Sequence, residues 1–311
     1  MPTEVSLPTR SGLALAARAY GLDPRAPAAE PHRYVLLHGW MDNAASFHLL
    51  APALLAALPP LSTVLAVDLP GHGLSGHVPG GLYALPLHAA LLCEALELLG
   101  WERYTLVCHS MGGGVGLLLA GSHPSRARAL VLLDSAGPLP AAPAEAPGAL
   151  ARALASKAAL AARPAASTYA APEDAVAARL ATVRAYPGAQ TLSPEAARAL
   201  VGRMLAQREE GGGWRWTFDA HIKFPSLFSL QEEAVLAFCT SLSAAGVPVL
   251  LLRARAGWPY PEAAMQARAA AMQAQVVPLD GGHHAHADPA TAPEVARLLL
   301  EWLRGKGMLE A

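Results

Sequence analysis

One short run, VCHSMGGG at residues 107–114, constrains the fold of this 311-residue chain more than any other feature. It joins an apolar, strand-like segment to a glycine-rich, helix-like one, with Ser110 at the turn. A strand passes so sharply into a helix only where small residues lie two positions before and after the turn, and Cys108 and Gly112 occupy those positions. Glycine is more usual than cysteine at the first of them. The run therefore predicts a strand–turn–helix unit that exposes the Ser110 hydroxyl as a nucleophile.

Short apolar runs alternate with helical patterns on both sides of this unit. The sequence predicts strands near residues 5–7, 13–20, 34–37, 62–68, 104–108, 130–133, 247–252 and 275–279. It predicts helices near residues 85–100, 111–120, 262–272 and 291–304. Such alternation with short connections is typical of an α/β protein with a mostly parallel sheet, in which ligands bind at the carboxyl ends of the strands.

Residues 138–235 interrupt this alternation. They are rich in Ala and Pro, have helical spacing and contain no run that resembles a buried strand. Pro172 and Pro194 suit helix starts, and three consecutive glycines suit a turn before the aromatic residues 214–218. We therefore expect an α/β core made of residues 1–137 and 236–311, and a helical cap made of residues 138–235.

A second strand end carries a motif that suits the same chemistry. Residues 36–40, LLHGW, finish a strand with His-Gly, and a loop of this kind can offer the backbone N–H of Trp40 to an oxyanion. The N–H of Met111, directly after the serine, is the expected second donor. We expect these two N–H groups to stabilise a negatively charged tetrahedral intermediate.

A serine hydroxyl is a weak nucleophile until a positioned base takes its proton, and histidine is the usual base near neutral pH. Residues 280–286, DGGHHAH, follow the last predicted strand, where a loop can reach across the strand ends to Ser110. His283 is the preferred base because it directly follows the glycine pair. His284 and His286 remain as alternatives.

The base needs a carboxylate that orients it, expected after a later strand in the chain order serine, acid, histidine. The strand at residues 247–252 is the first place to look, but it continues as RARAGW without a carboxylate. Asp134 ends the strand that follows the serine unit, and its side chain can approach the same histidine. We expect Asp134 to be the acid, with Glu262 in reserve.

The spacing of His284, His286 and Asp288 also spells HxHxD, a fragment of a metallohydrolase pattern. The next residue is Pro289 rather than histidine, the run is nearly at the C-terminus, and no second ligand cluster follows. We therefore expect neither a metal nor a cofactor.

The balance of charges and the apolar pattern exclude several classes of protein. Twenty-three basic residues face 24 acidic ones without a basic stripe, so nucleic acid is not an expected partner. No stretch of about 18 apolar residues occurs, and the N-terminal residues lack the pattern of a signal peptide. Three widely spaced cysteines suit reduced core positions. We expect a cytoplasmic protein with no membrane span and leave its oligomeric state open.

Together, HGW at 38–40, DLPGHGLS at 68–75, HSMGG at 109–113 and GGHHAH at 281–286 resemble the α/β-hydrolase superfamily. HGWMDN at 38–43, LLD at 132–134 and residues 214–230 are similar to the subfamily called serine hydrolase-like proteins. The resemblance implies a twisted, mostly parallel eight-stranded sheet with a helical lid after the sixth strand. It also implies the assigned roles of Ser110, His283 and the two oxyanion donors. It favours Asp134, since some superfamily members place the acid after the sixth strand.

These features predict a serine hydrolase that cleaves small-molecule carboxylic esters through an acyl-enzyme, with a Ser-His-Asp triad and no cofactor. Serine at the turn argues against dehalogenase or epoxide-hydrolase chemistry, which uses a carboxylate there. The alternatives are lactone opening, carbon–carbon bond hydrolysis or perhydrolysis on the same triad, and a non-catalytic binding module of the same fold. Aromatic side chains of the predicted cap either line an acyl pocket or pack against the core; these are Trp214, Trp216, Phe218, Phe224 and Phe228.

Overall fold

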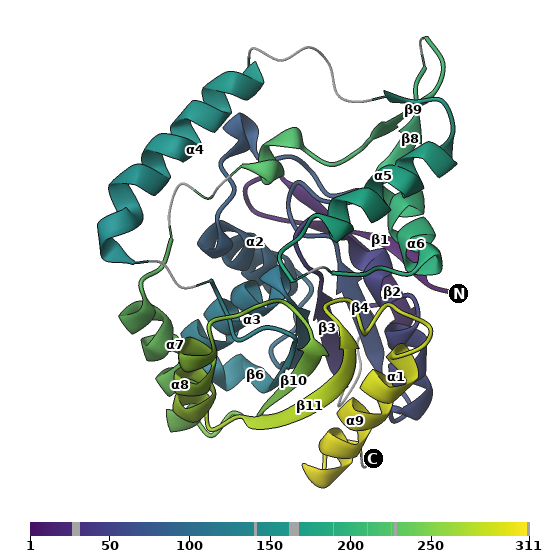
Figure 1. Cartoon of the computed structure of the whole chain (residues 1–311). Coiled ribbons are helices and arrows are strands. Elements are labelled where there is room, and N and C mark those ends of the chain that lie inside the picture. The colour runs from purple at the N-terminus through teal and green to yellow at the C-terminus, as the bar shows by residue number, and fades with distance from the viewer. Residues whose placement is uncertain are drawn as a thin grey trace.

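An eight-stranded sheet lies at the centre of the molecule in the computed structural model (Figure 1), which describes residues 1–26, 32–139, 142–161, 168–188, 190–209, 211–224, 226 and 229–309. In spatial order the strands are β1 (Thr3–Pro8), β2 (Ala14–Gly21), β4 (Thr63–Val67), β3 (Arg33–Leu37), β5 (Tyr104–His109), β6 (Ala127–Leu133), β10 (Val249–Ala256) and β11 (Gln275–Gly282). Pairing is antiparallel between β1 and β2 and between β2 and β4, and parallel between all other neighbours. The predicted mostly parallel sheet of eight strands is confirmed.

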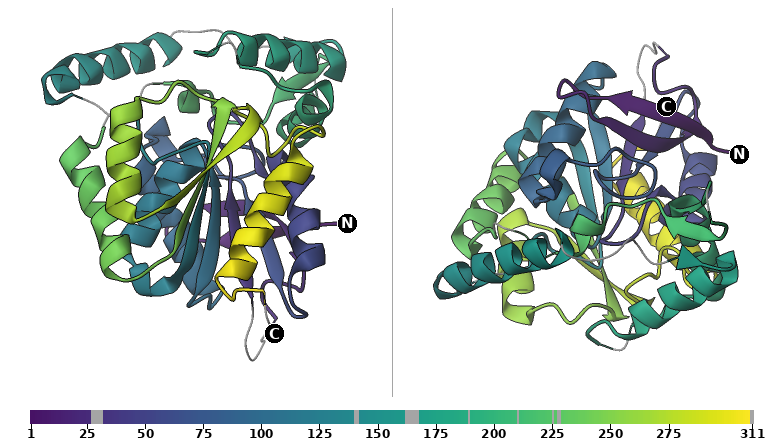
Figure 2. Two further views of the ribbon diagram at one scale, coloured as in Figure 1. Left: turned by 60° about the horizontal axis from the view of Figure 1, so that its bottom comes forward. Right: turned by 90° about the horizontal axis from the view of Figure 1, so that it is seen from above.

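Helices cover both faces of the sheet, as its strand sequences require. The middle strands β3, β4, β5 and β6 are almost entirely buried and therefore read as continuous apolar runs. One face is covered by α2 (Leu85–Leu98), α3 (Met111–Ser122), α7 (Glu232–Ala244) and α8 (Glu262–Met272). The other face is covered by α1 (Leu50–Ala57) and α9 (Ala292–Gly305), as Figure 2 shows. Short 3-10 helices occur at Ala44–Phe47, Pro79–Gly81, Pro124–Arg126, Pro143–Glu145 and Ala220–Lys223.

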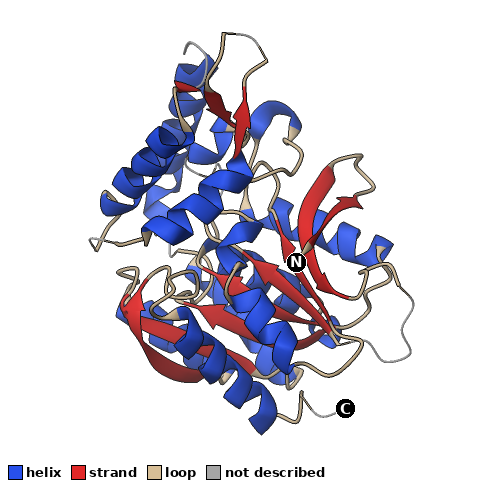
Figure 3. Cartoon of the chain, turned by 90° about the vertical axis from the view of Figure 1, so that its right-hand side faces the viewer, coloured by secondary structure: helices blue, strands red, loops and turns tan. Residues whose placement is uncertain are grey.

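The segment that interrupts the alternation lies above the carboxyl ends of the parallel strands (Figure 2). It contains α4 (Ala146–Ala161), α5 (Pro172–Arg184) and α6 (Pro194–Met204). It also contains a small antiparallel sheet of β7 (Thr168–Tyr169), β9 (Trp214–Trp216) and β8 (Leu205–Gln207), which Figure 3 shows apart from the central sheet. The sequence did not predict these strands, because two or three half-exposed residues produce no apolar run.

Two kinds of contact join this segment to the rest of the molecule. The first is a hydrophobic cluster, separate from the two faces of the central sheet, in which residues of α5 and α6 pack against Met41 and Ala287 in loops at the strand ends. Arg268 of α8 is fully buried and donates to the backbone oxygens of Ala136 and Pro138, where the chain enters the segment. Its other arm forms an ion pair with Glu232, where the chain returns to α7. The division into a core and a cap at residues 138 and 235 stays a prediction.

None of the helices formed by the described residues has the length and apolar character needed to cross a membrane.

Candidate active site

Ser110 lies at a sharp turn between β5 and α3, where the sequence predicted a nucleophile. Its backbone φ of 52° and ψ of −118° lie outside the helical and extended regions. A Cβ at Gly112 would lie 2.3 Å from the Leu37 carbonyl oxygen, so only glycine lets the helix start so close to β3. A Cβ at Gly116 would lie 2.4 Å from the sulfur of Cys108, so this glycine makes room for the cysteine in the strand. The turn therefore depends on small residues on both sides of the serine.

The structure brings Ser110, His283 and Asp134 into one hydrogen-bonded chain. The distance from Ser110 Oγ to His283 Nε2 is 2.8 Å, and the distance from His283 Nδ1 to Asp134 Oδ2 is 2.6 Å. With the proton on Nδ1 donated to Asp134, Nε2 is free to accept the Ser110 proton. His283 is 5% exposed and Asp134 is 6% exposed, so water competes little for these bonds. This arrangement can turn the serine hydroxyl into a nucleophile.

Asp134 directly follows β6 and has a left-handed backbone conformation, with a φ of 46°. Its Oδ1 accepts from the Arg253 guanidinium and from the Ala254 N–H at 3.2 Å, and its Oδ2 accepts from the Trp258 N–H at 2.8 Å. Burial acts to raise the pKa of Asp134, but hydrogen bonds and charge from His283, the Trp258 N–H and Arg253 outweigh it and hold the pKa below its ordinary value. The carboxylate is therefore ionised at neutral pH.

The reserve candidates for base and acid lie elsewhere. His284 Nε2 is 3.4 Å from Asp42 Oδ2, and His286 Nε2 is 3.2 Å from Ser46 Oγ. Burial is the main cause that lowers the pKa of His286, to about 3. Glu262 is exposed at the start of α8 and bonds to Gln266 on its own helix.

The HxHxD residues do not converge on a common point. Asp288 accepts from the Ala290 N–H at 3.0 Å, while His284 and His286 face different partners, Asp42 and Ser46. Across the part of the chain that the structure describes, no group of three or more His, Cys, Asp or Glu side chains could hold a metal ion.

Several groups that steady the site carry no signal in the sequence. His109 of β5 donates from Nε2 to the backbone oxygen of His283 at 2.9 Å. Gln190 accepts from the His283 N–H at 3.2 Å through its side-chain oxygen, and its amide nitrogen donates to the Gly257 oxygen at 3.0 Å. These contacts join residues 67 to 174 positions apart, so no local spacing predicts them.

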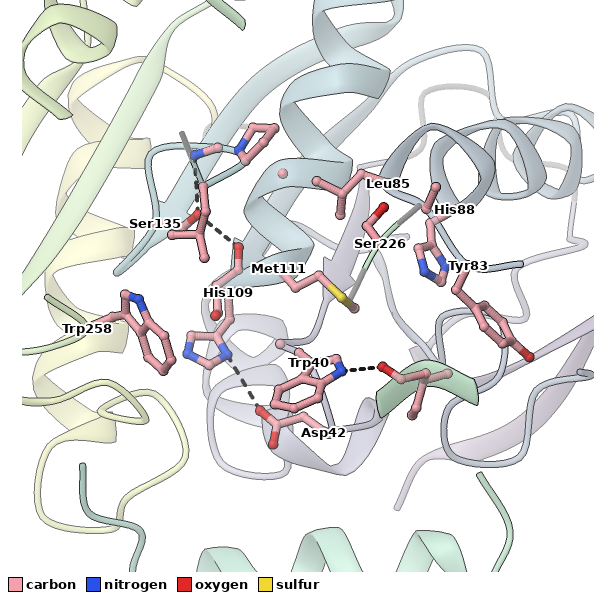
Figure 4. Close-up of a pocket in the computed structure, with 18 of the residues that line it drawn as sticks. Trp40, Asp42, Tyr83, Leu85, His88, His109, Met111, Ser135, Ser226 and Trp258 are labelled. Atoms are coloured by element: carbon pink, nitrogen blue, oxygen red, sulfur yellow. Dashed lines mark hydrogen bonds and ion pairs between the residues drawn. The ribbon is translucent and has the colours of Figure 1, made fainter. Parts of the chain in front are cut away.

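A buried ion pair joins α5 to the loop after β3, and its carboxylate, Asp42, belongs to the lining of the same pocket as Ser110. Arg179 Nη2 lies 2.5 Å from Asp42 Oδ1, and Arg179 Nη1 lies 3.1 Å from the Tyr186 hydroxyl. Burial acts to raise the pKa of Asp42, but His284 and the Arg179 guanidinium outweigh it and hold the pKa well below its ordinary value of 3.8. The carboxylate in turn lies 3.6 Å from His109 Nδ1 (Figure 4).

Replacing Arg179 with methionine is expected to lower the free energy of unfolding by about 3 to 5 kcal/mol, because it leaves the Asp42 charge buried without its cation. Urea denaturation of the variant and the parent at several pH values measures this. The pKa of Asp42 is depressed in the folded state, so the pair stabilises above pH 3.8 and its contribution is lost as the pH falls below that value. The two stabilities should therefore converge in acid.

Arg184→Met is the matched control, since Arg184 lies exposed at the end of the same helix. It is expected to change stability by less than about 0.5 kcal/mol. Equal stability of the Arg179 variant and this control at neutral pH would contradict the assignment of a stabilising pair.

The two expected oxyanion donors border the same pocket as Ser110. Met111 is the first residue of α3, where a backbone N–H has no acceptor within the helix. Trp40 is 39% exposed, and its indole N–H donates to the Ile222 oxygen at 2.6 Å (Figure 4). This bond ties the loop after β3 to the 3-10 helix at Ala220–Lys223.

A cavity of about 380 Å³ opens above Ser110. Figure 4 shows Trp258 on one side of it and Leu85, His88 and Tyr83 on the other, with Trp40 and Met111 between them. Most of its other lining is apolar or aromatic, including Pro138, Leu139, Tyr186, Ile222, Phe224, Leu230 and Tyr260. A cavity of this size and character suits a small, largely uncharged ligand.

The expectation that Trp214, Trp216 and Phe218 line the pocket is not met. Trp216 and Phe218 stack on one another with ring centroids 5.5 Å apart, inside the hydrophobic cluster of α5 and α6. Trp214 lies in β9, away from the cavity lining. Phe218 and Trp216 bury apolar surface of α5 and α6, and neither of the two rings lines the cavity. Phe224 does line it, and Phe228 lies outside the described residues.

Comparison with known proteins identifies a family and a full-length structural relative. The model of the family described as alpha/beta hydrolase fold matches residues 35–290. The solved structure of the hypothetical protein PA1622 from Pseudomonas aeruginosa PAO1 is 35% identical in sequence, with a TM-score of 0.82. The match covers 97% of this chain and 99% of that protein.

Two further relatives are similar over a shorter stretch. A serine hydrolase-like protein of Danio rerio is 42% identical over 105 residues, which is 33% of this chain and 31% of the relative. A pimeloyl-[acyl-carrier protein] methyl ester esterase of Aeromonas hydrophila is 42% identical over 108 residues, or 32% of this chain and 37% of the relative. The matched part of the chain therefore spans about a third of the length of each of these relatives.

Proposed function

The chain belongs to the α/β-hydrolase fold family, and from this premise we propose that it hydrolyses carboxylic esters through an acyl-enzyme on Ser110. The observation that carries the proposal is the hydrogen-bonded chain from Ser110 Oγ to His283 at 2.8 Å and from His283 to Asp134 at 2.6 Å. The resemblance to the serine hydrolase-like proteins is confirmed over about a third of the chain, and the name of the Aeromonas hydrophila relative supports ester chemistry.

In the proposed reaction, Ser110 Oγ attacks the ester carbonyl carbon while His283 Nε2 takes its proton. Asp134 holds the imidazole in the required tautomer and stabilises the imidazolium that forms. The backbone N–H groups of Trp40 and Met111 stabilise the negative oxygen of the tetrahedral intermediate. The intermediate collapses when His283 returns the proton to the leaving alcohol. Water, activated by the same histidine, then releases the acid from Ser110.

The cavity lining supports a small ester without a free charge. The two carboxylates at the cavity, Asp42 and Asp134, are each paired with an arginine, Arg179 and Arg253. Neither carboxylate therefore offers an unpaired negative charge to a positively charged substrate. Lactone opening, carbon–carbon bond hydrolysis and perhydrolysis would use the same hydrogen-bonded chain, and a substrate panel separates them.

Treatment of the folded protein with a fluorophosphonate is expected to give one adduct, on Ser110, because this reagent phosphonylates an activated serine. Peptide mass spectrometry locates the adduct. A panel of 4-nitrophenyl esters of increasing acyl length then tests turnover and the size of the cavity together. The absence of an adduct on Ser110 would contradict the proposal and favour a non-catalytic binding module.

A further inference from the structure

The segment of residues 253–258, at the end of β10 and in the loop after it, lacks the carboxylate that its position led us to expect, yet it surrounds the carboxylate of Asp134. Four of its residues meet that side chain: Arg253, Ala254, Gly257 and Trp258. We call these four residues the acid cradle. Because β6 and β10 are paired neighbours in the sheet, an acid at the end of β6 lies within reach of the loop that leaves β10.

Residues of the acid cradle bind the two carboxylate oxygens of Asp134 separately. Oδ1 accepts from the Arg253 guanidinium and from the Ala254 N–H, so it faces away from the histidine. Oδ2 accepts from the Trp258 N–H at 2.8 Å and from His283 at 2.6 Å. Rotation of the carboxylate would break at least one of these bonds. The arrangement therefore leaves Oδ2 as the oxygen that meets His283.

Arg253, Asp134 and Trp258 form a closed ring of hydrogen bonds. One arm of its guanidinium meets Asp134 Oδ1, while Nη2 donates to the backbone oxygen of Trp258 at 2.8 Å. The same Trp258 supplies the N–H to Oδ2, so one arginine holds both the carboxylate and the loop that binds it. The Arg253 side chain is 22% exposed, against 4% for Asp134, so the ion pair is largely shielded from water.

Gly257 provides the space that this arrangement needs. A Cβ at this position would lie 2.3 Å from both Oδ1 and Oδ2 of Asp134. A side chain here would therefore push the carboxylate away from His283.

We propose that Arg253 is a positioning residue for the reaction, acting through Asp134: it fixes the orientation of the carboxylate and offsets its charge beside His283. The inference rests on the proposed function. It gives the segment that lacks a carboxylate of its own the role of orienting the carboxylate of Asp134. The charged groups involved are Asp134, directly after β6, and Arg253 on β10, and both act on His283 in the loop after β11. The other titratable rings that face His283 are those of His109 on β5 and of His284, with ring centroids 4.6 and 5.3 Å from that of His283. Burial is the main cause that lowers the pKa of both His109 and His284. A positive charge beside the Asp134–His283 pair disfavours addition of a proton to that pair. Loss of this charge should therefore change the pH dependence of kcat/KM.

Arg253→Gln tests the proposal in ester hydrolysis followed against pH. The expected loss in kcat/KM is roughly 10- to 100-fold, as for removal of a hydrogen bond to a charged group. The acid limb of the kcat/KM profile is expected to move to higher pH by about one unit. Arg253→Lys, which keeps the charge but not the forked geometry, should return the acid limb close to that of the parent and recover only part of the rate.

Arg255→Gln is the matched control, because Arg255 lies two residues further along β10 and pairs with the exposed Asp280. It is expected to keep both the rate and the pH profile of the parent. A reduced rate in Arg253→Gln with an unmoved acid limb would overturn the proposal, because a purely structural arginine behaves in that way. An acid limb in Arg253→Lys equal to that in Arg253→Gln would overturn it as well.

Gly257→Ala tests the geometry without removing a charge. It is expected to lower kcat/KM by about 100-fold, since a displacement of about 1 Å at a reacting group has an effect of that order. Gly202→Ala, in α6 with no atom within 4 Å of the added Cβ, is the control for the same substitution. Equal rates for the two variants would contradict the claim that Gly257 leaves the space in which the Asp134 carboxylate is held.

Failure of this proposal can be told apart from failure of the proposed function. If Ser110→Ala keeps the activity of the parent, the proposed function fails, whatever Arg253 does. If Ser110→Ala is inactive and Arg253→Gln behaves like Arg255→Gln, only the role of Arg253 fails.

Discussion

Replacing Ser110 with alanine is expected to lower kcat for 4-nitrophenyl esters by on the order of 10⁶-fold, the loss seen when the nucleophile of a comparable triad is removed. The reason is that His283 then has no hydroxyl to activate, and the acyl-enzyme cannot form. Steady-state kinetics with a stopped-flow check for an acyl-enzyme burst measure the effect. KM should change little, since the cavity lining is unaltered.

The control for this variant is Ser122→Ala, at the exposed end of the same helix and outside the lining of the cavity. It should keep the rate of the parent. The fluorophosphonate adduct should be lost in Ser110→Ala and retained in Ser122→Ala. Activity of Ser110→Ala above a hundredth of the parent rate would contradict the assignment of Ser110 as nucleophile.

Replacing Asp134 with asparagine is expected to lower kcat by about 10⁴-fold, as in a triad whose aspartate is changed in this way. Asparagine keeps the size of the side chain, but its amide can present an N–H to His283 and so favour the wrong tautomer of the imidazole. The charge that stabilises the imidazolium is lost as well. Single-turnover kinetics at saturating ester separate this loss in the chemical step from any change in binding.

Glu262→Gln and Asp280→Asn are the controls for Asp134, because both carboxylates are exposed and neither contacts His283. Each should keep the rate of the parent. The double variant of Ser110→Ala with Asp134→Asn should be no less active than Ser110→Ala alone, since the two residues act as a unit. Near-normal turnover of Asp134→Asn would move the role of the acid to another group.

The architecture was largely predictable because its signals are local. The strands near residues 34–37 and 104–108 read as apolar runs since both of their faces are buried. The helix expected over residues 262–272 occurs with the same limits, Glu262–Met272. By contrast, the short strands of the inserted segment escaped prediction, because half-exposed pairs and triplets of residues leave no periodic pattern.

The side chains that line the cavity were harder to predict than the elements. Trp216 and Phe218 looked suited to a pocket, but they pack among the helices of the inserted segment. Aromatic character shows that a ring will be buried and does not show against which surface. That choice depends on how α5 and α6 sit above the strand ends, which is a matter of long-range packing.

The sequence by itself determined the turn that carries Ser110 and the position of His283 after the last strand. These depend on near neighbours: small residues beside the turn and glycines before the histidine act within a few positions of the residue concerned. Only the tertiary structure decided what surrounds the acid, because Arg253, Gly257 and Trp258 lie 119 or more positions beyond Asp134. The order of strands in the sheet, with β6 beside β10, brings them together, and no spacing along the chain encodes that neighbourhood.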